Sequence, residues 1–202
     1  LCKANYLMQK IELEIVALSH SITQSNSYAV ILGEVNGLRR LPIVIGGFEA
    51  QAIAVALENM HPSRPLTHDL MKNFMTAFNL QLQEVYICDL QEGIFYSKLV
   101  CYNSNDTIEI DSRTSDALAL AVRFGCPVYV YEHILDQAGL TNEKTDKVDM
   151  PATITKTNDR SDLAKLSLAE LNQLLSEVLE QEDYIKAIDI RDEIAKRNAP
   201  KK

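Results

Sequence analysis

The sequence predicts an α+β fold, in which a mixed or antiparallel sheet is packed by helices, followed by a helical hairpin. Two patterns predict the first part: apolar residues alternate with polar ones in several short segments, and other segments carry apolar residues at helical spacing. A third observation is the polar stretch 141–162, rich in Thr, Asp, Lys and Asn. We therefore expect a domain at residues 8–140, a flexible linker at 141–162 and a hairpin at 163–198.

Alternation and turn signals define the strands. The pair Asn36-Gly37 is a strong hairpin signal between two apolar runs, and Glu92-Gly93 joins a second pair of alternating runs. We expect strands at residues 10–18, 28–32, 41–45, 82–90, 94–102, 107–110 and 128–131.

The helices are predicted from apolar spacing and from their end signals. Gly46-Gly47 breaks the third strand before a helix at 48–58, and Thr67 is placed to cap a helix at 68–78. An Ala- and Leu-rich helix follows Asp116 and ends at Gly125, where glycine supplies the left-handed conformation. A short helix at 132–138 closes the domain, and two apolar stripes within 163–198 predict two tightly joined helices.

Composition limits the possible environments. No apolar run approaches the ~20 residues that a bilayer requires, so we expect no membrane contact. Residues 1–7 lack a Met start and a signal-peptide layout, and we expect the domain to begin near Met8. The four cysteines show no metal-ligand spacing, which predicts reduced structural thiols and a cytoplasmic location. The net charge of −8 argues against broad electrostatic capture of nucleic acid.

Three polar segments stand where a strand or loop meets a helix. In the first, Gly46-Gly47 precedes Glu49, an arrangement that suits either anion binding or a tight turn with a dipole-favoured acid. In the second, His68 and Asp69 open a helix. They supply a general base, a metal ligand or a phosphate contact, or they belong to a capped helix start. Adjacent helical residues do not face each other, so these two are not a simple dyad.

The third segment runs from Asp111 to Asp116 and holds two carboxylates on either side of Arg113. Carboxylates of this kind hold Mg²⁺ or Mn²⁺, and an arginine stabilises charge on a phosphoryl group. The alternative is a salt bridge from Arg113 to one acid, with Thr114 or Ser115 as the N-cap. The residues alone leave both interpretations open.

At these residues the sequence resembles the bifunctional nuclease family over about residues 8–140. The resemblance rests on blocks that occur in order along the chain: 41–46, Glu49-Ala50 with Ala52-Ile53, 64–70, 111–121, Glu132 and Ala138-Gly139. Thr114 departs from the family pattern, which usually has proline there; we expect this to change the stiffness of the turn and not the chemistry.

The resemblance implies a nuclease that hydrolyses phosphodiester bonds of DNA, RNA or both. The residues it implies as catalytic are His68, Asp69, Asp111, Arg113 and Asp116. It implies substrate contacts from Arg64 and Ser115, and a divalent metal, Mg²⁺ or Mn²⁺, held by Glu49, Asp111 and Asp116. In this mechanism His68 or a metal-bound water acts as base and Arg113 steadies the phosphate.

The C-terminal segment resembles the UVR motif of bacterial excision-repair proteins, through Glu182-Asp183-Tyr184, Ala187 and residues 191–194. This resemblance implies pairing with another UVR-motif protein or with a second copy of the chain, and a role in DNA repair or stress response. Exposed sheet edges and the apolar stripes also predict a homo-oligomer. The competing hypothesis is a non-catalytic binding or regulatory module that uses the hairpin for protein–protein contact; the acidic composition favours it.

Overall fold

A computed structural model describes residues 9–20, 27–141, 163, 166–180 and 184–198 of the chain. The chain divides into two compact units, Leu1–Met150 and Pro151–Lys202. The first unit holds a mixed sheet with its helices and the second holds a pair of helices, so the predicted α+β class is confirmed.

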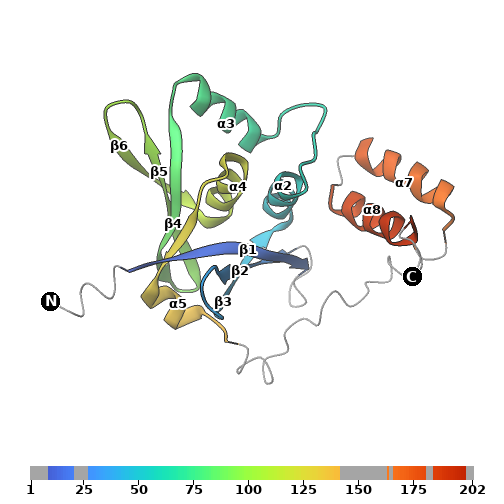
Figure 1. The fold of residues 1–202 in the computed structure, drawn as a ribbon. Helices are drawn as coiled ribbons and strands as arrows, with labels where there is room; N and C mark the ends of the chain where they lie inside the picture. Colours follow the sequence, from blue (N-terminus) through green and yellow to red (C-terminus); the bar gives the residue numbers. More distant parts are fainter. Residues whose placement is uncertain (1–8, 21–26, 142–162, 164–165, 181–183, 199–202) are drawn as a thin grey trace. The chain divides into compact units, whose positions relative to one another are not determined.

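The first unit is built on a seven-stranded sheet in the order β3-β2-β1-β7-β4-β5-β6 (Figure 1). Neighbouring strands are antiparallel except for β4 and β7, which run parallel. The strands are β1 (Lys10–His20), β2 (Ser27–Glu34), β3 (Arg40–Gly46), β4 (Gln81–Gln91), β5 (Ile94–Tyr102), β6 (Thr107–Arg113) and β7 (Val128–Tyr131). Both predicted hairpins are confirmed, and Glu92 and Gly93 have the positive φ angles that their tight turn requires.

Three helices lie together on one side of this sheet: α2 (Gly47–Leu57), α3 (Thr67–Ala77) and α4 (Thr114–Phe124) (Figure 1). The central helix is α4, which packs against α2, α3, β4 and β5. Its residues from Ala117 to Ala121 are all buried, because their small and aliphatic side chains permit close packing on every side. A short helix, α5 (Glu132–Ala138), packs against β3, β4 and β7.

Three helices start earlier than the sequence predicts, α2 by a single residue. We expected Thr67 to cap α3, but Thr67 is its first residue, and the Asp69 carboxylate accepts the Leu66 N–H at 2.9 Å instead. We expected a strand that ends at residue 110, but β6 continues to Arg113, which is the N-cap of α4. The polar segment is therefore the end of an edge strand running directly into a helix. Gly125 ends α4 with φ 66°, as predicted.

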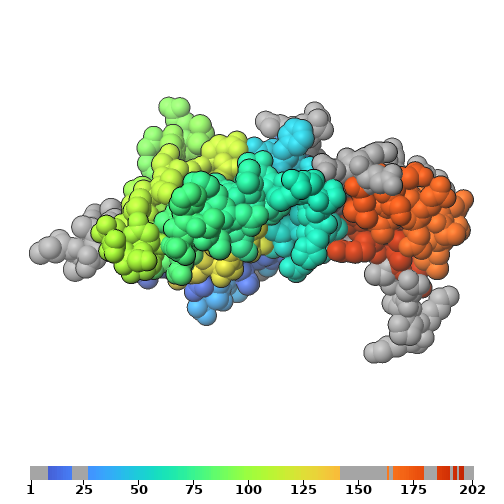
Figure 2. All heavy atoms as spheres, turned by 90° about the horizontal axis from the view of Figure 1, so that it is seen from above, coloured from blue at the N-terminus to red at the C-terminus, as the bar shows by residue number. Residues whose placement is uncertain are grey.

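The exposed side of α3 is apolar. Leu70, Phe74 and Phe78 recur at four-residue spacing and are largely solvent-exposed, and the two phenyl rings are in contact. Figure 2 shows α3 on the molecular surface. Self-association, which the sequence predicts, stays a prediction.

The second unit contains α7 (Leu168–Glu180) and α8 (Tyr184–Asn198). Leu171, Val178, Ala187 and Ile190 form its buried cluster. Ser167 and Glu170 exchange side-chain bonds with each other's N–H groups, which is a capping box at the start of α7. Two packed helices agree with the predicted hairpin; the predicted linker and residues 181–183 lie outside the described residues.

Two further observations bear on the sequence-based expectations. Within the described ranges, none of the helices has the length and apolar character needed to span a membrane.

Cys88, Cys101 and Cys126 are free thiols, and burial raises the pKa of each, to about 11 for Cys126. These three cysteines are therefore protonated at neutral pH, and Cys2 lies outside the described residues.

Candidate functional site

Four side chains from distant parts of the sequence form one bonded chain. Arg113 donates from Nη1 to Glu49 at 3.0 Å, and from Nε and Nη2 to the two Asp116 oxygens at 2.8 and 3.2 Å. Asp116 Oδ1 also lies 3.1 Å from His68 Nε2. The predicted residues Glu49, His68, Arg113 and Asp116 are therefore brought together, and we call them the polar cluster.

The fold assembles the cluster by bringing together the first turns of α2, α3 and α4. Glu49, His68 and Asp116 each stand within three residues of a helix start, and Arg113 is the last residue of β6. Acids at helix starts are favoured by the positive end of the helix dipole. Gly46 leaves room for Glu49, because a Cβ on Gly46 would meet Glu49 Oε2 and this carboxylate would have to shift.

A buried hydroxyl pair fixes the junction of β6 and α4. Thr114 Oγ1 lies 2.7 Å from Ser97 Oγ and donates to the Phe95 carbonyl at 3.0 Å. Both hydroxyls are buried, so their mutual bonding removes the cost of leaving polar groups without partners. Thr114 thus attaches the start of α4 to β5, and this anchoring holds Arg113 in place.

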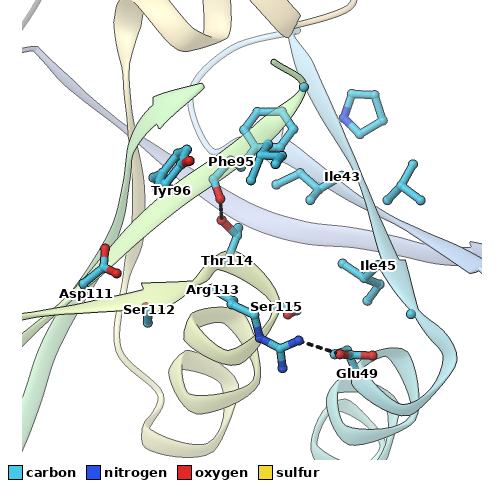
Figure 3. Close-up of a pocket in the computed structure, with 15 residues that line it drawn as sticks. Ile43, Ile45, Glu49, Phe95, Tyr96, Asp111, Ser112, Arg113, Thr114 and Ser115 are labelled. Carbon is cyan, nitrogen blue, oxygen red and sulfur yellow. Dashed lines mark hydrogen bonds and ion pairs between the residues drawn. The ribbon is translucent and has the colours of Figure 1, made fainter. Parts of the chain in front are cut away.

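An open cleft of 480 Å³ adjoins the cluster. Residues 42–46 of β3 form one wall, and residues 93–96 and 111–115 form the other (Figure 3). Glu49, Arg113 and Ser115 line the cleft, whereas Asp116 and His68 are not among its lining residues. The cluster therefore presents Arg113 and Glu49 to the cleft, and Asp116 and His68 support Arg113 from behind.

Arg113 keeps donors available for a ligand. A guanidinium has five N–H groups, and three of them are used in the bonds to Glu49 and Asp116. The Arg113 side chain is 68% exposed, so the remaining two are accessible. A fixed guanidinium with free donors is suited to bidentate contact with a phosphate or carboxylate.

Asp116 is held in its charged form. Burial alone would raise its pKa, but hydrogen bonds from Arg113 and His68 outweigh burial and hold the pKa below its ordinary value of 3.8. The same bonds raise the pKa of Arg113. The Arg113–Asp116 pair is therefore ionised at neutral pH.

Asp69, predicted as catalytic, makes contacts of a different kind. Its Oδ1 accepts Arg123 Nε at 2.6 Å, and its Oδ2 accepts the Leu66 N–H. Arg123 is 5% exposed and also donates to the carbonyls of Ala52 and Ala119. Asp69 thus joins α3 to α4 and is separate from the polar cluster.

Asp111 and Arg64 also lie apart from the polar cluster. Asp111 is in register with Lys98, and Ser112 with the buried Ser97. Directly opposed side chains share a face of the sheet, so Asp111 faces away from α4, at the rim of the cleft and apart from Glu49 (Figure 3). Arg64 is exposed in the segment before α3 and does not line the cleft.

The predicted metal ligands Glu49, Asp111 and Asp116, all within the described residues, do not form a binding site for one ion. In the described part of the chain, no three side chains of His, Cys, Asp or Glu are placed to hold one ion. Glu49 and Asp116 instead share Arg113, so a guanidinium lies between the two carboxylates. Mg²⁺ or Mn²⁺ would need several oxygen ligands at one point. Metal binding stays a prediction.

The depressed carboxylate pKa values predict the acid stability of the domain. Burial alone would raise the pKa of Asp69, but bonds from Arg123 and Leu66 N–H lower it overall, as happens for Asp116. As the pH falls, these carboxylates take up protons near pH 3.8 in the unfolded chain and only at a lower pH in the folded chain. We therefore expect the free energy of unfolding to decline as the pH falls below about 4, until the carboxylates are protonated in the folded chain as well. Urea unfolding at pH 7, 5 and 3 measures this, and Asp69→Asn should flatten the decline; equal stability at pH 5 and 3 would contradict it.

Fold and site together define an α+β domain in which three helix starts place an ionised arginine at an open cleft. The model of the bifunctional nuclease domain matches residues 30–143, and the chain belongs to this family. An uncharacterized protein of Mycobacterium tuberculosis is 48% identical over 115 residues, which cover 57% of this chain and 68% of that protein.

Relatives that carry the nuclease name are more distant. Bifunctional nuclease 1 of Arabidopsis thaliana is 23% identical over 176 residues, or 80% of this chain and 54% of that protein. Bifunctional nuclease 1 of Oryza sativa subsp. japonica is 27% identical over 103 residues, or 50% of this chain and 31% of that protein. The chain thus spans about half or less of the length of these two named nucleases.

Sequence reasoning did not identify Arg123 or the cleft wall. A signal for Arg123 was present: a single arginine follows the apolar run from Ala117 to Val122, where a buried charge requires a partner. No comparable signal marked Ile43, Ile45 and Phe95 as lining residues, because apolar strand residues are ordinarily core.

Proposed function

We propose that this chain is a nuclease that hydrolyses phosphodiester bonds of DNA, RNA or both, with the cleft as its active site. The observation that carries the proposal is the state of Arg113, a cleft-lining residue that two carboxylates hold in place while two of its N–H donors make no bond. Membership of the bifunctional nuclease family supports the same reaction.

In this mechanism Arg113 binds the phosphodiester and stabilises the charge that develops on its oxygens. Fixed donors of this kind stabilise a transition state because they need no reorganisation during the reaction. Asp116 holds Arg113 through two bonds, and His68, which does not line the cleft, contacts Asp116. His68 and Asp116 are positioning residues in this scheme.

Glu49 is the proton acceptor in the proposed reaction. It lines the cleft, and its Oε1 accepts from Arg113 while Oε2 lies against Gly46. A water held between Glu49 and a phosphate on Arg113 would transfer its proton to the carboxylate as its oxygen bonds to phosphorus. The bond from phosphorus to the leaving sugar oxygen would break in the same step, and that oxygen would take up a proton from solvent. The sequence predicted His68 or a metal-bound water as base; His68 is not a cleft-lining residue, so the scheme assigns this step to Glu49.

The acidic composition is compatible with a locally held substrate. With a net charge of −8, the chain gains little from counterion release, and affinity must come from contacts within the cleft. Arg64 is exposed and would add a second phosphate contact outside the cleft. Binding through so few cations predicts a shallow dependence of KM on salt.

An assay on purified full-length protein tests this function. Labelled single-stranded DNA and RNA are incubated with Mg²⁺, with Mn²⁺ and with a chelator. We expect cleavage by the wild type and a fall in kcat/KM of about 10²-fold in Arg113→Met, because one positioned donor group is lost. Unchanged thermal unfolding would show that the variant is folded. Equal activity in the variant would identify a contaminant, and the chelator arm decides the predicted metal requirement.

A second candidate function is a non-catalytic binding module. It is favoured by the pairing of Arg113 with two carboxylates, which leaves these three side chains without a net positive charge. Nucleic-acid binding without cleavage in every arm of the assay would support it.

The helices α7 and α8 provide the proposed recruitment function. As a UVR-type hairpin they would pair with another such hairpin or with a second copy of the chain, in DNA repair or stress response. Their apolar residues support this, since two short helices bury little surface alone and Leu168 and Leu179 are exposed.

A further inference from the structure

The wall of the cleft formed by β3 is an open sheet edge. β3 pairs with β2 on one side, and on the other side the described residues form a single bridge, between Arg40 and Leu140. Arg40 exchanges both of its main-chain hydrogen bonds with Leu140, at 2.8 Å each. The main-chain groups of Arg40 therefore point away from β2.

The direction of the main-chain groups alternates along an antiparallel strand. Pro42, Val44 and Gly46 consequently point the same way as Arg40, toward the open edge. Pro42 has no N–H to offer, which agrees with an edge position. Gly46 is the N-cap of α2, and an N-cap carbonyl accepts the first bond of its helix. Val44 is therefore the residue of this free stretch that presents both an N–H and a C=O to the cleft.

The opposite wall supplies an aromatic ring. Phe95 lies between β5 and β3, with Ile43 nearby (Figure 3). Phe95 is half-buried, and its carbonyl is fixed by Thr114. Arg113 lines the same cleft. The cleft thus combines an aromatic ring, one donor–acceptor pair on a strand edge and a cation.

This combination matches the parts of a nucleotide. A base stacks on an aromatic side chain and bonds through a donor and an acceptor on its edge, while its phosphate contacts arginine. A cleft of 480 Å³ lies within the ordinary range for small-ligand sites. On the basis of the proposed function, we infer that the cleft is a base-binding subsite, in which the Val44 main chain reads the base edge and Phe95 stacks on the base.

A peptide strand fits the same edge less well. The edge is covered at Arg40, lacks an N–H at Pro42 and ends where α2 begins, so an added strand would find few partners. Strand addition gains its affinity from a continuous row of main-chain bonds. A base needs one donor and one acceptor, and Val44 supplies both.

A binding experiment tests the subsite separately from catalysis. Full-length ¹⁵N-labelled protein is titrated with the four nucleoside 5′-monophosphates and with ribose 5-phosphate, which lacks the base. We expect the Val44 amide signal to move with at least one nucleotide and not with ribose 5-phosphate, and that nucleotide to bind at least about 10-fold more tightly. Equal binding of all five ligands, with the Val44 amide unmoved, would overturn the inference.

Variants of the two contacts sharpen this test. Val44→Pro removes the N–H of a residue that is 62% exposed, and Val44→Thr is its matched control, which keeps the N–H. We expect nucleotide affinity to fall about 10-fold in Val44→Pro and in Phe95→Leu, and to stay within about twofold in Val44→Thr. Ribose 5-phosphate should bind all four proteins equally. If Val44→Pro fails to fold, the titration of the wild-type Val44 amide and the affinity of Phe95→Leu still test whether the cleft binds a base.

Failure of the subsite can be told from failure of the proposed function. A wild type that cleaves an oligonucleotide with an abasic scissile position as fast as the intact one would remove the subsite and keep the nuclease. Base-dependent binding without cleavage would keep the subsite and remove the nuclease. A Val44 amide that moves with protein concentration and not with nucleotides would assign the edge to a second copy of the chain, which overturns the inference.

Discussion

Glu49→Gln is expected to lower kcat for phosphodiester cleavage by 10²- to 10⁴-fold, the range that general acid–base catalysis contributes. The amide keeps the size of the carboxylate and one oxygen that can accept from Arg113, so the cluster should stay assembled and KM should change little. The loss would then fall on the chemical step, because an amide does not take a proton from water. Steady-state kinetics on RNA and single-stranded DNA measure both parameters.

Two comparison variants make this result interpretable. Glu109→Gln is the matched control, since Glu109 is also a glutamate paired with a cation, Lys98 at 2.8 Å, but lies outside the cleft lining. It should retain full activity. His68→Gln should cost less than Glu49→Gln, because His68 acts through Asp116. Loss of activity in His68→Gln with a fully active Glu49→Gln would return the role of base to the imidazole that the sequence predicted.

Asp111→Asn tests another member of the predicted catalytic set. Asp111 faces the side of the sheet that carries Lys98, so we expect it to contribute less than Glu49. The sequence placed Asp111 and Asp116 in one segment and therefore in one site. The structure separates them because Asp111 lies within β6, opposite Lys98, whereas Asp116 lies in the first turn of α4.

Local patterns predicted most of the fold. Alternation located the strands, and the two hairpin turns and Gly125 were read correctly from residues with well-understood preferences. The strand order was not accessible, because β7 lies between β1 and β4 through pairings far apart in sequence. The start of α4 was misplaced for a related reason: the Thr114 hydroxyl bonds to Ser97 and Phe95 instead of capping its own helix.

The sequence allowed us to predict which residues belong to the candidate site, but not which side chains bond to one another. Glu49, His68, Arg113 and Asp116 were selected because each stands at a helix start, and all four meet. Asp69 was selected for the same reason, yet its carboxylate bonds to Arg123, 54 positions away. A charged residue beside a helix start serves a site or a packing contact equally well, and only the tertiary structure distinguishes these uses.

Arg123→Met is expected to destabilise the domain by about 3 kcal/mol, the lower end of the cost of removing one partner from a buried ion pair. The substitution keeps the apolar stem and removes the bonds to Asp69, Ala52 and Ala119, which connect α4 to α3 and α2. It leaves a half-exposed carboxylate at the start of α3 without its cation, and this partial exposure is why the lower end applies. Urea unfolding followed by circular dichroism measures the change.

The double variant separates the ion pair from the packing of the arginine. Asp69→Asn keeps an oxygen for the Leu66 N–H, so in the Arg123→Met background it should cost less than in the wild type, with a coupling energy of about 1 kcal/mol or more. Arg64→Met, at an exposed arginine, is the control and should change stability by less than about 0.5 kcal/mol. Because α3 carries His68 beside Asp69, loss of the pair should also loosen the His68–Asp116 contact and lower activity at temperatures where the domain is still folded. Additive stability changes together with unaltered activity would show that Asp69 and Arg123 contribute independently, and that α3 is positioned by its apolar contacts alone.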